Sequence, residues 1–127
     1  MTEIERRQCK RYKTSQNAFA VFRPNYHKLG PIKNISKGGL LFEYIDHENP
    51  EKDIEKGFER EIDILISQDN FYLPKIPCKV KHNSEVIHNH SFITSIHMRR
   101  CGIQFEELTQ HETDSLASLL SHFESLH

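Results

Sequence analysis

The hydrophobic pattern changes its period once, late in the chain, and this change limits the folds that the chain can adopt. In segment 60–67 (REIDILIS), Ile62, Ile64 and Ile66 alternate with other residues. Alternation of this kind indicates a strand with one buried face. In segment 109–127, by contrast, apolar residues recur at i, i+3, i+4 and i+7, which indicates an amphipathic helix. The residues of this stripe are Leu116, Leu119, Leu120 and Phe123.

Residues 109–112 (TQHE) fit the S/T-x-x-E capping box, in which two side chains satisfy free backbone amides at the start of a helix. We therefore expect a C-terminal helix over 109–127. Strands followed by one helix favour a mainly β domain, a small antiparallel barrel with a helix packed on it. The expected strands cover 17–23, 39–45, 60–67, 71–86 and one strand or a pair between 92 and 105. Pro74 and Pro77 would interrupt the ladder of segment 71–86, which predicts an edge strand or a bulge there.

The chain has 127 residues and a net charge of −1, which fit one domain with a single core. Its charge is unevenly distributed. Residues 1–13 carry five basic side chains against two acidic ones, whereas residues 46–61 carry seven acidic against three basic. A small basic segment on a nearly neutral protein predicts weak non-specific affinity for nucleic acid, because that affinity grows with the number of phosphates neutralised. We therefore expect a small phosphorylated ligand and no nucleic-acid partner.

Several functional classes lack support in the sequence. No apolar run reaches the roughly 18 residues that span a bilayer, so we expect no membrane insertion and a cytoplasmic location. The three cysteines form no CxxC pair and the nine histidines include no HExxH motif, so no metal site is expected. No nucleophile and base can be placed together, so we expect neither enzymatic activity nor a cofactor.

A polar motif with two glycines, Asn34-Ile35-Ser36-Lys37-Gly38-Gly39, lies between two expected strands. On a strand end, Asn34 and Ser36 are two residues apart and so point to the same face. The glycines permit a tight turn or the close approach of a ligand to the backbone. The basic segment Arg6-Arg7-Gln8-Cys9-Lys10-Arg11 can supply the positive charge that this motif lacks. We interpret the two segments as one anion-binding site.

Together, the two segments resemble the signature of the PilZ domain family. Residues 7–11 fit RxxxR, residues 34–39 fit (D/N)xSxxG, and Gly102-Ile103-Gln104-Phe105 is similar to the late Gly-x-x-Phe strand of that family. The resemblance covers nearly the whole chain and implies a split, six-stranded antiparallel β-barrel within a single domain. Its parts would be a flexible basic N-terminal arm (1–15), the barrel (16–108) and the C-terminal helix (109–127).

The resemblance implies a receptor for the bacterial second messenger cyclic di-GMP, a ligand with two phosphodiester charges and two guanines. The ligand-binding residues that it implies are Arg6, Arg7, Arg11, Asn34, Ser36 and Gly39. Secondary candidates are Lys10, Gly38, Arg99 and Arg100. Arginine forks can grip phosphates or the N7 and O6 edge of guanine, and Gly39 would leave room for a purine. By the same resemblance, Arg6, directly before RxxxR, favours an intercalated dimer of the ligand.

Two further expectations concern the output of such a receptor. Ligand binding would order the arm and pass the signal to an unidentified protein effector. The apolar stripe of segment 109–127 would either pack on the barrel or pair with a second subunit, which leaves a homodimer open. Asn34 stands where many family members have aspartate, and it offers one acceptor oxygen and no charge. The alternative function is a protein–protein adaptor of the same fold that binds no nucleotide, although both motifs are intact.

Overall fold

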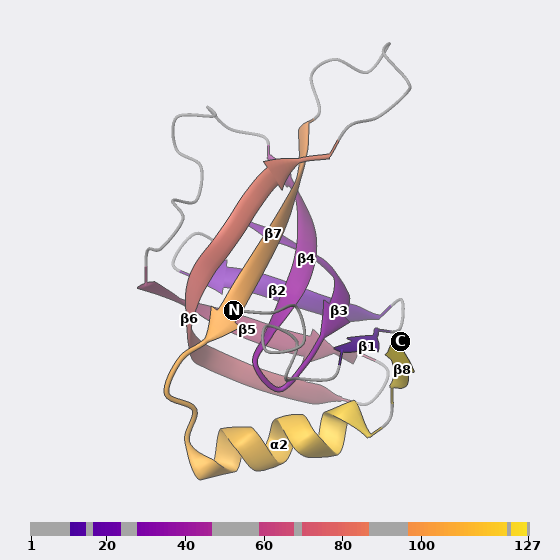
Figure 1. Ribbon diagram of the computed structural model, residues 1–127, viewed down its shortest axis with the longest axis vertical. Coiled ribbons are helices and arrows are strands. Elements are labelled where there is room, and N and C mark those ends of the chain that lie inside the picture. Colours follow the sequence, from indigo (N-terminus) through magenta and orange to yellow (C-terminus); the bar gives the residue numbers. More distant parts are fainter. Residues whose placement is uncertain are drawn as a thin grey trace, which may run out of the picture.

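The computed structural model describes residues 11–14, 17–23, 28–46, 59–67, 70–86, 97–121 and 123–126. The strands of this part of the chain are β1 (Arg11–Lys13), β2 (Ala18–Arg23), β3 (Leu29–Ile35), β4 (Gly39–Asp46), β5 (Glu59–Ile66), β6 (Phe71–Glu85), β7 (His97–Phe105) and β8 (Glu124–Leu126). The helix is α2 (Gln110–Leu120). Figure 1 shows the strands wound into a barrel, with α2 lying across one of its ends.

The barrel is closed because the two strands at the ends of its strand order, β2 and β3, also pair with each other. The strands run in the order β2-β5-β6-β7-β4-β3, and β2 pairs with β3 to complete the ring. Every one of these pairs is antiparallel. The predicted mainly β fold, a six-stranded antiparallel barrel with a C-terminal helix, is thus confirmed.

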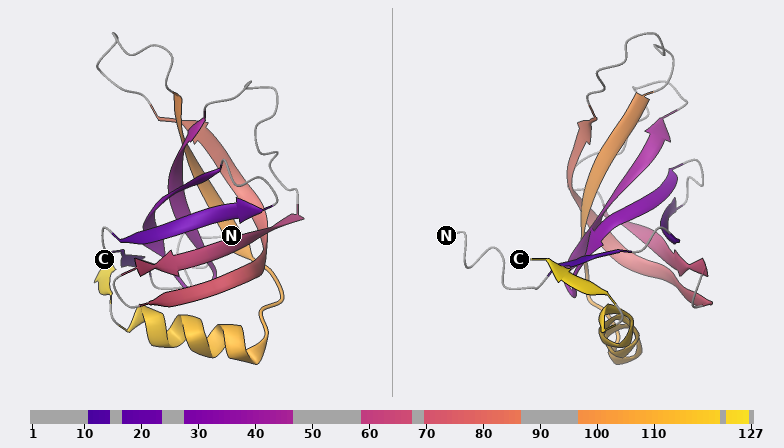
Figure 2. Two further views of the ribbon diagram at one scale, coloured as in Figure 1. Left: turned by 180° about the vertical axis from the view of Figure 1, so that it is seen from behind. Right: turned by 90° about the vertical axis from the view of Figure 1, so that its right-hand side faces the viewer.

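Strand β3 divides one of its edges between two partners. Residues 29–31 pair with β2, whereas Asn34 and Ile35 pair with β1. Strand β8 then pairs with the other edge of β1, so that these two short strands extend the sheet beyond the barrel wall (Figure 2). Residues 11–13, predicted as part of the N-terminal arm, therefore form a strand that is fixed to the barrel.

The interior of the barrel follows the alternation of the sequence. Ile62, Ile64 and Ile66 are all buried, as are Leu40, Phe42 and Tyr44 of β4. The ring of Phe42 stacks against Phe22 at 6.5 Å between centroids and tilts against Tyr44 at 5.6 Å. Burial of these apolar side chains provides the main driving force for closing the sheet.

Helix α2 starts where the capping box predicts. The Thr109 side chain accepts a hydrogen bond from the Glu112 amide, and the Glu112 side chain accepts one from the Thr109 amide. Leu116, Leu119 and Leu120 are buried in the barrel core, so the apolar stripe packs on the barrel.

The helix is shorter than the predicted segment 109–127. It ends at Leu120, and Phe123 then packs partly buried against the core. The following residues form β8 instead of continuing the helix, because the open edge of β1 offers their backbone hydrogen-bond partners.

Strand β6 differs from its predicted place at an edge, because it lies between β5 and β7. The predicted bulge is present. The register with β5 shifts between Ile62 and Ile64, so that Pro74 and Lys75 have no partner in that register, and Lys75 has a φ of 54°. The bulge removes Pro74 from the ladder, which is how a proline can occupy a central strand.

Candidate ligand-binding site

The motif 34–39 forms the end of β3 and a tight turn into β4. The Ser36 amide donates to the Gly39 carbonyl at 2.8 Å, and the Gly38 amide donates to Ser36 Oγ at 3.1 Å. The Phe105 amide donates to the Gly38 carbonyl at 2.8 Å, which fixes the turn to the end of β7. The turn is therefore a rigid platform.

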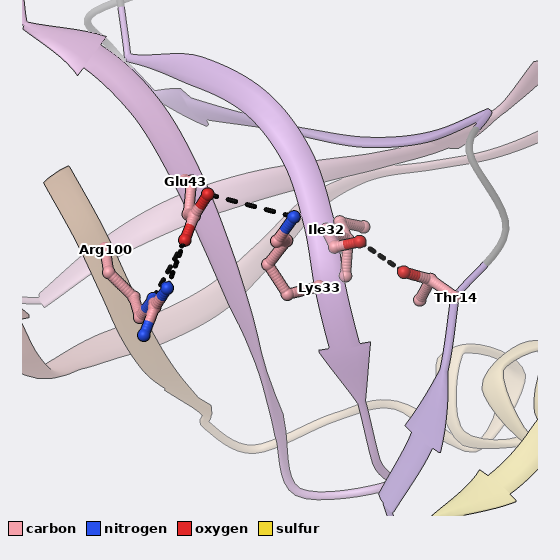
Figure 3. Close-up of polar contacts among 5 residues, drawn as sticks. All are labelled: Thr14, Ile32, Lys33, Glu43 and Arg100. Carbon is pink, nitrogen blue, oxygen red and sulfur yellow. Dashed lines mark hydrogen bonds and ion pairs between the residues drawn. The ribbon is translucent and has the colours of Figure 1, made fainter. Parts of the chain in front are cut away.

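Strand β1 brings the second arginine of RxxxR to this platform. Tyr12 pairs with Ile35 and Lys13 with Asn34, so Arg11 lies beside the position of Ser36. Tyr12 packs against the core, whereas Arg11 and Lys13 are exposed, so both cationic side chains point away from the barrel. The Thr14 hydroxyl donates to the Ile32 carbonyl and fastens the end of β1 to β3 (Figure 3).

The remaining residues of the basic segment precede β1. Arg6, Arg7 and Lys10 lie outside the described residues. Because Lys10 directly precedes Arg11 in the sequence, the start of β1 determines where the basic segment joins the barrel. That junction is beside Ser36, since Arg11 is one residue before the Tyr12–Ile35 pair.

The outer face next to Asn34 continues across β4 and β7. Asn34 pairs with Leu41, and Leu41 pairs with Gly102. The flanking residues Leu40, Phe42, Cys101 and Ile103 are buried in the core. Since successive side chains in a strand alternate between faces, Asn34, Leu41 and Gly102 lie on the outer face.

Gly39 has a packing role in addition to the ligand role predicted for it. A Cβ on Gly39 would lie 2.1 Å from the Ile103 carbonyl oxygen on β7. No side chain tolerates such an approach, so Gly39 allows β4 and β7 to lie close together beside the turn. The close packing of β4 against β7 is therefore sufficient to explain why position 39 is a glycine, whether or not a purine also binds there.

The secondary candidates Arg99 and Arg100 are not brought to the turn. Arg100 lies opposite Glu43, four residues along β4 from Gly39, or about 13 Å at the usual rise of a strand. Its guanidinium contacts Glu43 Oε2 at 2.6 Å, and Lys33 Nζ lies 3.8 Å from Glu43 Oε1 (Figure 3). Arg99 donates to Asn83 Oδ1 at 2.7 Å. Both arginines therefore make structural contacts within the barrel wall.

The family model for the PilZ domain matches residues 5–122 of the sequence. The chain belongs to the PilZ domain family. The match covers both the basic segment and the motif 34–39, as well as the whole barrel and the whole of α2. No curated protein sequence matches the chain closely.

Solved structures share the fold of this PilZ domain. The PilZ domain with c-di-GMP of YcgR from Escherichia coli has a TM-score of 0.67 and 14% identity, over 91% of this chain and 89% of that chain. The K. pneumonia MrkH–c-di-GMP complex has a TM-score of 0.65 and 13% identity, over 91% of this chain and 51% of that chain. The present chain therefore spans about half the length of MrkH. At these identities the likeness shows a common fold.

Lys13 is a candidate that the sequence analysis of this PilZ domain missed as a site residue. It pairs with Asn34 and is exposed on the same face as Arg11. Its spacing of two from Arg11 could have identified it, but only if residues 11–13 had been expected to form a strand. A segment of three residues carries too little periodicity for that.

The described residues of the PilZ domain contain no group of three or more His, Cys, Asp or Glu that could hold a metal ion. Among the same residues, no helix has the length and hydropathy that crossing a bilayer requires. The thiols of Cys78 and Cys101 are buried. Burial, and then the neighbouring Cys101, raise the pKa of Cys78 to about 12, so this thiol is not a nucleophile at neutral pH.

Proposed function

We propose that this PilZ domain is a cytoplasmic receptor for cyclic di-GMP, which it binds on the outer face formed by β1, β3 and β4. The register of β1 on β3 carries the proposal, because it gathers Arg11 with Ser36 and Lys13 with Asn34. Two exposed cations next to a rigid polar platform suit a ligand with two phosphodiester charges. The motif 34–39 supplies polar groups and the basic segment supplies charge.

Each residue would have a distinct role toward the ligand. Arg7 and Arg11 would grip phosphates or the N7 and O6 edge of guanine with their planar forks. The side-chain oxygen of Asn34 would accept from the N1 and N2 donors of a guanine. The Ser36 hydroxyl accepts from the Gly38 amide and makes only a long contact of 3.4 Å to the Gly39 carbonyl, so its proton can turn to a phosphate.

The proposed output is a change in the basic segment. Binding would order Arg6, Arg7 and Lys10 over the outer face and create a surface that a protein effector recognises, with no catalysis. Arg6 would favour an intercalated dimer of the ligand. That proposal predicts two ligands per chain, and a stoichiometry that falls to one in Arg6→Ala.

Isothermal titration calorimetry with cyclic di-GMP tests the proposal. The wild type should bind, and Arg7→Ala and Arg11→Ala should each weaken binding by roughly 10- to 150-fold, because each loses a charge-assisted contact of about 1.5–3 kcal/mol. Arg60→Ala is the matched control, since among the described strands β5 pairs with β2 and β6 and not with β1, β3 or β4. It should leave the affinity unchanged.

Three other results would contradict the proposal. A flat titration of the wild type would favour the protein–protein adaptor that binds no nucleotide. Wild-type affinity in both arginine variants would show that the site is elsewhere. A binding affinity that falls steeply with salt and shows no preference for the cyclic dinucleotide would indicate a nucleic-acid ligand.

A further inference from the structure

The imidazole of His82 covers Gly102 on the outside of the barrel. A Cβ on Gly102 would lie 2.8 Å from both Cε1 and Nδ1 of His82, so the ring occupies the place of the missing side chain. Cys101 and Ile103 are buried in the core, so the Cβ side of Gly102 faces outward. His82 itself is exposed. An aromatic ring thus lies against the outer face of β7 and remains open to solvent.

A bulge in β6 places His82, and not Lys81, opposite Gly102. Val80 pairs with Ile103, and the next pair is His82 with Gly102, with the register shifting between Val80 and His82. Without the bulge, Lys81 would oppose Gly102. The extra residue therefore replaces a flexible cation by a planar aromatic ring at this point of the outer face.

The histidine lies in the same cross-strand row as the proposed ligand contacts. Gly102 pairs with Leu41, and Leu41 pairs with Asn34. Strands are about 4.8 Å apart, so the ring over β7 lies about 10 Å from the backbone of Asn34. Between them the outer face carries the Leu41 side chain, because Gly102 has no side chain and lies beneath the His82 ring. The row is a shallow shelf with Asn34 at one end and an aromatic ring at the other.

We infer that His82 is the far boundary of the cyclic di-GMP site and that its imidazole stacks against a guanine lying over Leu41, beside the ring. The inference rests on the proposed function and extends that site from β3 across β4 and β7 to β6. A purine stacks on any planar aromatic ring, because every base has a π-face. Gly102 permits this arrangement, because any side chain there would displace the ring.

Calorimetry with cyclic di-GMP on four variants tests the inference. His82→Ala should bind roughly 5- to 20-fold more weakly, as expected for the loss of one stacking contact, whereas His82→Phe should stay close to wild type. Gly102→Ala should resemble His82→Ala, because its methyl group would force the ring away. Lys81→Ala is the matched control, since this exposed neighbour has no partner in the β6–β7 register and should bind as wild type does.

A spectroscopic measurement separates stacking from a purely structural role. The Cε1–H resonance of His82, assigned by its absence in His82→Phe, should move upfield on saturation with ligand, because it enters the ring current of a guanine. Urea denaturation of each variant establishes that the protein is folded under the conditions of titration.

The outcomes distinguish this inference from the proposed function. If the wild type binds and His82→Ala binds equally well, the inference is wrong and the receptor function stands. Failure of phenylalanine to rescue the affinity, or an unmoved Cε1–H resonance, would also overturn stacking. If the wild type does not bind at all, the proposed function fails first.

Discussion

Arg100 Nη2 lies 2.6 Å from Glu43 Oε2, and Nε of the same guanidinium lies 2.9 Å from that oxygen. The Glu43 side chain is only 9% exposed, so its carboxylate depends on this partner and on Lys33. Arg100 was a secondary candidate for ligand binding, and in the structure it pairs with Glu43 between β4 and β7. Because of this ion pair, we expect a substitution of Arg100 to change the stability of the fold.

We expect Arg100→Ala to lower stability by about 1–3 kcal/mol, because it leaves a largely buried carboxylate with one distant cation. Urea denaturation measures the effect. Lys33→Ala is the control. It should lower stability by less than Arg100→Ala does, because Lys33 Nζ lies 3.8 Å from the carboxylate and Arg100 Nη2 lies 2.6 Å from it. If Arg100→Ala instead kept its stability and lost affinity for cyclic di-GMP, Arg100 would belong to the ligand site.

Asp63 should make stability depend on pH. Burial raises its pKa, but hydrogen bonds from the Arg23 side chain and the Lys75 amide, together with the charge of Arg23, outweigh burial and hold the pKa below 3.8. A depressed folded-state pKa contributes stability above the unfolded value, and this contribution is lost as the pH falls through the folded value. Asp63→Asn should therefore be less stable than wild type by about 1–3 kcal/mol at pH 7.

The difference in stability between Asp63→Asn and wild type should shrink as the pH falls below 3.8, the usual pKa of aspartate. Urea midpoints at pH 7, 5 and 3 measure it. Tyr72→Phe is a milder control, because it removes only the 3.2 Å hydrogen bond to Asp63 Oδ2. A difference that stays constant down to pH 3 would show that the charge of Asp63 is not what stabilises the β6 bulge.

Gly39→Ala should destabilise the fold by about 1–3 kcal/mol, because its methyl group would lie 2.1 Å from the Ile103 carbonyl oxygen. Thermal unfolding tests this, and Lys37→Ala is a control in the same turn whose side chain is exposed. A Gly39→Ala protein with wild-type stability and no affinity for ligand would instead support the purine-space role that the sequence predicts.

The buried thiols should resist alkylation in the native state. The pKa of Cys78 is about 12, and both Cys78 and Cys101 are at most 1% exposed. In a Cys9→Ser background, iodoacetamide at pH 8 should label neither thiol until urea unfolds the barrel. Mass spectrometry with and without urea measures this. Rapid native labelling of Cys78 would show that the barrel opens next to β6.

Local periodicity predicted much of the barrel because it encodes which side of each strand is buried. The alternation of Ile62, Ile64 and Ile66 located β5 and its inner face, and the pattern of Thr109 and Glu112 located the start of α2. These signals are local, since they depend on strand alternation and on hydrogen bonds within one helical turn.

The burial of Asp63 and the central place of β6 could not be predicted from local sequence patterns. Asp63 falls within an alternating strand and yet is buried, because Arg23 and the Lys75 amide reach it from β2 and β6. The central place of β6 was missed because its prolines indicated an edge. The bulge removes Pro74 from the ladder, and Pro77 precedes Cys78, the first residue of β6 that pairs with β7.

The sequence by itself determined the two halves of the candidate site, the basic segment up to Arg11 and the polar turn from Asn34 to Gly39, because residue type and spacing are sufficient to identify them. The tertiary structure decided how they meet. Pairing of β1 with β3 placed Arg11 beside Ser36 and added Lys13, and the β6 bulge placed His82 over Gly102. Register between strands distant in sequence is set by backbone hydrogen bonds and bulges, and a one-residue shift would turn each of these side chains to the other face.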